Sequence, residues 1–123
     1  MASPINIAEK FSQFDDRWSP KVIAELNGQA VKLAKVQGEF VWHDHAQEDE
    51  LFLVFAGTLV IDFEGGHSVT LTPGELYVVP RGVRHRPRTK DGQVVHLMLL
   101  EPINTKHTGD VQHGLTKSGY ERL

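Results

Sequence analysis

Short runs of strand-forming residues, divided by turns rich in glycine and proline, occupy the chain from Lys21 to Pro102. Asn27-Gly28 is typical of a two-residue hairpin, and further turn signals stand at Glu64-Gly65-Gly66-His67 and at Thr72-Pro73-Gly74. No helical pattern separates the runs, which excludes parallel strands joined by crossover helices. Many short strands at regular spacing predict an all-β sandwich or barrel.

The expected strands follow one another with little connecting chain. They are Val22–Leu26, Gln29–Val36, Phe40–His45, Glu50–Ala56, Thr58–Phe63, Ser68–Leu71, Leu76–Val79, Val83–Arg88 and Val94–Leu100. Before them, Ile7, Phe11 and Phe14 recur at helical spacing. This spacing predicts a short helix from Ile7 to Asp15 that covers an open end or edge of the barrel.

Composition is consistent with a single domain, because 123 residues with 40% hydrophobic content can bury one sizeable core. We divide it into an N-terminal helical segment (1–20), the barrel (21–102) and a polar C-terminal tail (103–123), which we expect to be loop or partly ordered. The absence of cysteine excludes disulfides and thiolate metal sites, and the net charge of −3 argues against nucleic acid as a partner. No segment has the apolar length of a signal peptide or a membrane helix, so we expect a cytoplasmic protein.

Two histidines and a glutamate lie close together between Gly38 and Gly57. His43 and His45 are separated by one residue in a run of strand formers, and alternate side chains of a strand point to the same face. Glu50 opens the next apolar run after a polar turn, so a hairpin would carry it back beside the histidines. Such nitrogen and oxygen ligands suit Zn, Fe, Mn, Ni, Co or Cu.

Glycines, proline and histidine recur at fixed spacing on both sides of this stretch. The two patterns are Gly38-x4-His43-x-His45-x4-Glu50-x6-Gly57 and Gly74-x5-Pro80-x-Gly82-x2-His85-x3-Thr89. Together they resemble the two conserved motifs of the cupin superfamily, which are small jelly-roll β-barrels. The departures are a first glycine one residue closer to His43 than usual and Thr89 in place of a frequent asparagine. The resemblance implies four metal ligands, which are His43, His45, Glu50 and His85.

Three histidines and one carboxylate leave two positions of an octahedral ion open, which is typical of catalytic rather than structural metals. The cupin resemblance implies dioxygenases, sugar isomerases and epimerases, decarboxylases, lyases and non-catalytic binding proteins. We favour a metal-dependent enzyme that acts on a small polar or anionic molecule. The alternative is a module that binds or senses a small ligand without turnover, because no unambiguous general base accompanies the ligands. Cupins of this kind commonly dimerise, so we expect a homodimer that pairs through the Val22–Val36 hairpin.

Glu50, rather than Glu48, is the expected carboxylate ligand. Glu50 is the first residue of a predicted strand, where the backbone is fixed. Glu48 lies in a polar turn, where ordering its side chain costs conformational entropy. Glu50, Phe52 and Val54 would share one strand face, which is then the cavity face.

Four further residues are candidates for the pocket around the metal: Phe52, Tyr77, His96 and Met98. Tyr77 could donate a proton to a substrate, although core packing is the more ordinary role of a tyrosine on such a strand. His96 and Met98 share one face of the strand Val94–Leu100, and the sequence leaves open whether His96 lines the pocket or packs in the core.

A basic run surrounds His85 and comprises Arg81, Arg84, Arg86, Arg88 and Lys90. It could bind an anionic substrate, but strand alternation favours a solvated outer face. If His85 points inward, then Arg84, Arg86 and Arg88 point outward. His67, at a hairpin tip, and His107 and His113, in the polar tail, are expected at the surface.

Overall fold

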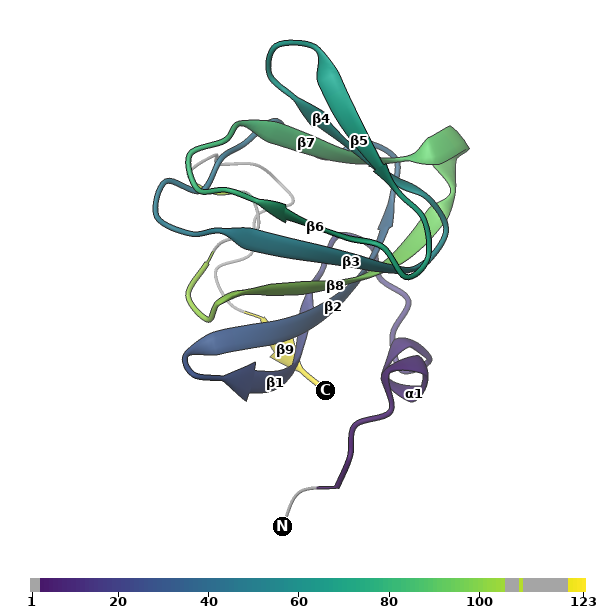
Figure 1. Ribbon diagram of the computed structural model, residues 1–123. Coiled ribbons are helices and arrows are strands. Elements are labelled where there is room, and N and C mark those ends of the chain that lie inside the picture. Colours follow the sequence, from purple (N-terminus) through teal and green to yellow (C-terminus); the bar gives the residue numbers. More distant parts are fainter. Residues whose placement is uncertain (1–2, 106–108, 110–119) are drawn as a thin grey trace.

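Two β-sheets face each other in the computed structural model, which describes residues 3–105, 109 and 120–123 (Figure 1). The larger sheet has the strand order β6-β3-β8-β2-β1-β9, and the smaller has the order β5-β4-β7. The elements are α1 (Ile7–Phe11), β1 (Lys21–Leu26), β2 (Gln29–Gln37), β3 (Glu50–Ala56), β4 (Leu59–Phe63), β5 (His67–Leu71), β6 (Leu76–Val79), β7 (His85–Thr89), a 3₁₀ turn (Lys90–Gly92), β8 (Val94–Pro102) and β9 (Glu121–Arg122). The all-β prediction is confirmed, and most predicted strands end within a few residues of the observed ones.

The core lies between the two sheets and follows the alternation of their strands. Along β8 every second residue is buried, so that Val95, Leu97 and Leu99 point inward. In β3 the inward residues begin with Glu50, which is followed on the same face by Phe52 and Val54. One ionisable ligand candidate therefore enters the core on a strand that is otherwise apolar on that face.

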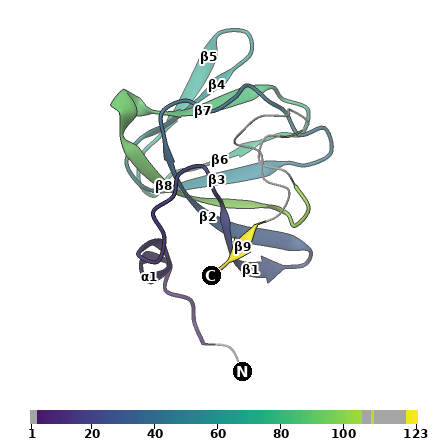
Figure 2. The same cartoon turned by 180° about the vertical axis from the view of Figure 1, so that it is seen from behind.

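The N-terminal helix is shorter than predicted and lies elsewhere. It ends at Phe11 rather than Asp15, with Ser12 as its C-cap, and the Phe14 carbonyl beyond it accepts a hydrogen bond from the Lys35 ammonium at 2.7 Å. The Phe11 ring stacks on His96 at 4.8 Å and contacts Phe55 at 5.7 Å. Both partners belong to the outer face of the larger sheet, so the helix packs on that face, and Figure 2 shows it beside the larger sheet.

The predicted strand Phe40–His45 is wrong as a regular element. Only isolated bridges form here, between Glu39 and Arg88 and between His43 and His85. Phe40 and His43 are both buried although they are three positions apart, and a regular strand would turn these side chains to opposite faces. The segment therefore bends between them, and backbone hydrogen bonds from the amides of Phe40 to Pro87 and of His43 to His85 tie it to β7.

At the C-terminal end, Glu121 and Arg122 pair in parallel with Lys21 and Val22. This short strand was not predicted within the polar tail, whose residues 106–108 and 110–119, including His107 and His113, lie outside the described residues. Because β2 is central and β1 is partly covered by β9, the hairpin expected to form a dimer edge is not free. No helix in the described part of the chain is long and apolar enough to cross a membrane.

Candidate metal centre

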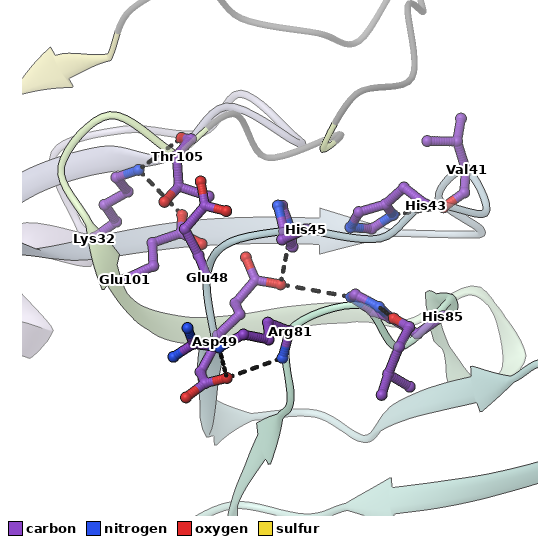
Figure 3. A network of polar contacts seen from close by, with 12 residues as sticks. Lys32, Val41, His43, His45, Glu48, Asp49, Arg81, His85, Glu101 and Thr105 are labelled. Carbon is purple, nitrogen blue, oxygen red and sulfur yellow. Dashed lines mark hydrogen bonds and ion pairs between the residues drawn. The ribbon is translucent and has the colours of Figure 1, made fainter.

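Three segments of the chain bring four ligand candidates to one point inside the barrel (Figure 3). His43 and His45 come from the bent segment between β2 and β3, Glu50 is the first residue of β3, and His85 is the first residue of β7. One potential ligand atom of each lies within 4.8 Å of all the others. All four residues are buried, with exposed fractions of 5% or less.

Two backbone carbonyls orient the imidazoles of His43 and His85. Nδ1 of His43 is 2.9 Å from the Val41 carbonyl oxygen, and Nδ1 of His85 is 2.9 Å from that of Val83. Because a carbonyl only accepts, each Nδ1 carries the proton and each Nε2 keeps a free lone pair. The backbone therefore selects the tautomer that a metal ion requires.

The inward atoms of the cluster have no hydrogen-bond partners. Nε2 of all three histidines and Oε1 of Glu50 are buried without one. Oε1 of Glu50 lies 3.4 Å from Nε2 of His45 and 3.5 Å from Nε2 of His85. Buried polar atoms that converge without partners are costly, and a cation between them would satisfy all four at once. The donor set therefore fits a divalent transition metal.

Burial and mutual charge shift the protonation equilibria of these groups. Burial, aided by the neighbouring His85, lowers the pKa of His43 to about 4. Burial also opposes protonation of His45, but the adjacent Glu50 carboxylate outweighs it and raises the pKa of that imidazole. The pKa of Glu50 is well below its usual value, because Glu101 and the two neighbouring histidines outweigh the effect of burial. Glu50 is thus an anion and His43 a neutral ligand near neutral pH.

A second buried carboxyl group, Glu101, lies beside Glu50 and is paired with Lys32. The Lys32 ammonium is 3.1 Å from Oε1 of Glu101, and both side chains are fully buried. The Tyr120 ring lies 3.7 Å from the same ammonium. Burial and the charge of Glu50 raise the pKa of Glu101 well above its usual value, against the effect of Lys32. The buried Lys32–Glu101 pair therefore lies next to the carboxylate ligand and stabilises its ionised form.

A small cavity of about 30 Å³ adjoins the cluster at His43 and Glu50. Its other described lining residues are Trp18, Pro20, Ala34, Val36, Phe40, Phe52, Pro87, Leu97 and Leu99. This volume exceeds the roughly 10–15 Å³ that a cavity needs to hold one water molecule. The wall is apolar except at the ligand candidates, so the cavity suits a small apolar molecule better than a charged one.

Comparison with known proteins decides the family. The family model described as "Cupin domain" matches residues 30–101, which is more than half of the chain. The chain is a cupin. A structure of a cupin-2 domain protein from Shewanella frigidimarina is similar, with 51% identity, a TM-score of 0.76, and coverage of 80% of this chain and 93% of that one. Protein NMB1881 from Neisseria meningitidis has 32% identity and a TM-score of 0.73, with coverage of 81% and 99%.

Among curated proteins, this cupin is 40% identical over 67 residues to the uncharacterized protein YdbB of Bacillus subtilis. The match covers 54% of this chain and 59% of that protein. The cupin therefore spans less than two thirds of the length of that relative.

Two of the pocket candidates lie away from the cluster in this cupin. His96 and Met98 are on the face of β8 opposite to Val95, Leu97 and Leu99, and His96 stacks under Phe11. The expectation that they line the pocket is wrong, because alternation relates residues to one another but does not say which face is inside. Neither does His96 belong to the core between the sheets.

The other two candidates lie on the inner side. Phe52 lines the cavity, and its ring is 6.2 Å from that of His85. Tyr77 packs against the core and has its ring 5.7 Å from that of Phe63. This placement agrees with the packing role for Tyr77 rather than with a proton donor at the cluster.

Two members of the basic run, Arg86 and Arg88, lie on the outer face of the smaller sheet, as alternation predicts. In β7, His85 and Thr89 are buried while Arg86 and Arg88 are only half-buried. Both arginines bind the Asp62 carboxylate, at 3.0 Å and 2.8 Å. Arg81 binds Asp49 at 3.4 Å and does not reach the cavity. Thr89 accepts a hydrogen bond from the Gly38 amide through its hydroxyl, which is a structural role.

Sequence reasoning missed Lys32, Glu101 and Trp18. Alternation could have found the first two, because Lys32 shares a strand face with Ala34 and Val36, and Glu101 shares one with Leu97 and Leu99. No pattern places Trp18 at the cavity, since it precedes the first strand.

Proposed function

We propose that this cupin is a metal-dependent enzyme in which His43, His45, Glu50 and His85 hold a divalent transition-metal ion. The observation that carries this proposal is the set of buried ligand atoms that converge without hydrogen-bond partners. A bound ion would supply Lewis-acid chemistry or, if it is redox-active, activation of dioxygen. The cavity next to His43 and Glu50 offers space for a small reactant on one side of the cluster.

Among the reactions open to such a site, oxidation by dioxygen is supported best. Isomerases, epimerases and lyases move protons, and they need an acid or base within reach of the substrate. Apart from the ligand candidates, the described lining residues are apolar or, like Trp18, have their polar atom engaged elsewhere. A dioxygenase places both oxygen atoms in its substrate, which supplies the electrons, so the reaction needs no external reductant.

The lining also bears on the substrate. No arginine or lysine is among the described residues that line the cavity, and Arg86 and Arg88 of the basic run lie on the outer face of the smaller sheet. We therefore propose a substrate whose reacting part is apolar, in place of the anionic molecule that the sequence suggested. The ligand residues hold the metal, while Phe52, Leu97 and Leu99 exclude water from the reacting atoms.

The alternative is a cupin that binds or senses a small ligand without turnover. One observation favours it, which is the same scarcity of acids and bases around the cavity. A sensor would use the metal only to hold its ligand, and it would release that ligand unchanged.

Metal analysis and oxygen uptake test the proposal. Protein purified without an affinity tag is analysed for bound metals, and then loaded separately with iron, manganese and nickel. Oxygen consumption is measured with a panel of small unsaturated compounds, with Glu50→Gln as the matched inactive control. Substrate-dependent oxygen uptake that Glu50→Gln abolishes supports the enzyme. Tight binding of a compound without oxygen uptake or product favours the sensor, and protein that binds no metal refutes the site itself.

A further inference from the structure

Building on the proposed function, we propose that Trp18 is a specificity-determining residue that closes the metal cavity and limits the width of the molecules that reach it. Trp18 precedes the barrel strands and is one of the residues that line the cavity beside His43 and Glu50. Nothing in the motif residues requires a tryptophan at this place.

Exposure distinguishes Trp18 from the rest of the cavity wall. Of the described residues that line the cavity, Trp18 alone is partly exposed, and all the others are buried. A residue that contacts both the cavity and solvent separates one from the other. Trp18 is therefore the described lining residue at the boundary between the cavity and solvent.

Three contacts hold this side chain and its backbone in place. The indole stacks on Phe40 with ring centroids 4.5 Å apart and an angle of 14° between the planes. Its Nε1 donates a hydrogen bond to the Gln37 carbonyl at 3.0 Å. The Trp18 amide donates to the Lys35 carbonyl at 2.9 Å. The indole is therefore a fixed wall and not a freely rotating surface group.

The backbone of Trp18 is strained in addition. Its φ angle is 56°, in the left-handed region that bulky residues rarely adopt. Such a conformation persists only where the surroundings over-determine it, and it concentrates at functional sites. This backbone conformation places the indole against Phe40 at the cavity wall. A glycine at this position would adopt the same φ angle without strain, but it would have no side chain to close the wall.

The size of the cavity defines the class of molecule that this wall admits. With about 30 Å³ available, a diatomic gas or a narrow rod-shaped ligand fits without moving the indole. We infer that a planar ring enters only when the Trp18 side chain leaves its stack on Phe40. We infer that Trp18 admits dioxygen-sized molecules and excludes rings that do not displace it.

Ligand binding to the cobalt-loaded protein tests this inference without relying on activity. The visible absorption of bound Co²⁺ is followed during titration with azide, which is narrow, and with imidazole, which is a ring. The variants are Trp18→Ala and Trp18→Phe, and Trp42→Ala is the matched control. Trp42 does not line the cavity, and its ring faces Arg86 at 5.1 Å on the outer side of the barrel.

We expect Trp18→Ala to tighten imidazole binding by about tenfold or more and to change azide binding by less than about twofold. Trp18→Phe keeps a ring on Phe40 and should give an intermediate gain, and it carries the test if Trp18→Ala does not fold. Equal imidazole affinity in wild type and both variants, with cobalt bound, overturns the role of Trp18 alone. Failure of every protein to bind cobalt overturns the proposed metal function and the role of Trp18 with it.

Discussion

For the buried pair of Lys32 and Glu101, we predict that the two single substitutions lower the free energy of unfolding by different amounts. Glu101→Met leaves the Lys32 ammonium fully buried, with the Thr105 carbonyl at 3.5 Å as its remaining hydrogen-bond acceptor. Removing one partner of a buried pair typically costs about 3–5 kcal/mol. Lys32→Met should cost less, about 1–3 kcal/mol, because Glu101 can take up a proton and its pKa is already raised.

Replacing both residues removes the charges together. The double variant Lys32→Met/Glu101→Met should therefore lie within about 2 kcal/mol of wild type, since well-packed apolar residues often replace a buried ion pair without loss. The free energy of unfolding is measured by urea denaturation of the metal-free proteins at pH 7, and exposed Lys90→Met serves as the control. A double variant whose cost equals the sum of the two single costs would refute the idea that the side chains act as a pair.

The same variants address the metal centre. Because Glu101 lies beside Glu50, its loss should also weaken metal binding, and supporting groups of this kind typically contribute about 10–100-fold in affinity. Isothermal titration with Zn²⁺ measures this effect. Unchanged affinity in the double variant would limit the pair to a role in stability.

Four further results are expected. Glu50→Gln should weaken metal binding at least about tenfold while Glu48→Gln leaves it nearly unchanged, and the reverse order in a metal titration would contradict the register of β3. The folded-state pKa of His43, about 4, is below its usual value of 6.5, so the unfolded chain gains a proton first as pH falls. The metal-free protein should therefore lose up to about 3 kcal/mol of stability between pH 6.5 and pH 4, which urea melts can follow, and a His43→Asn variant should lack that loss. Removing the metal with a chelator should lower the melting temperature, and calorimetry that finds no change would argue against coupling of metal binding to folding. A homodimer is still expected, now through β6, an edge strand of the larger sheet with Leu76 and Val78 55% and 44% exposed, and sedimentation at micromolar concentration tests it.

The strands were largely predictable from the sequence because they depend on local patterns, whereas the four-ligand set followed from the resemblance of two separate motifs to those of cupins. The alternation in β3 places Glu50, Phe52 and Val54 on the inner face, as observed. The bend between Phe40 and His43 was not predictable, since it arises from hydrogen bonds to β7, which is distant in sequence. The position of His96 was ambiguous for a different reason. It lies on the outer face of the sheet, but the N-terminal helix covers that face, so the sequence pattern did not distinguish an outer position from an inner one.

Glu50 begins a strand of the larger sheet, whereas His85 begins a strand of the smaller one. An ion bound by both would cross-link the two halves of the barrel in a chain that contains no cysteine. Such a cross-link acts between layers that are otherwise held together mainly by apolar packing. Amide hydrogens of β3 and β7 should then slow their exchange together when the ion binds, and the sheets could separate only after a coordination bond breaks.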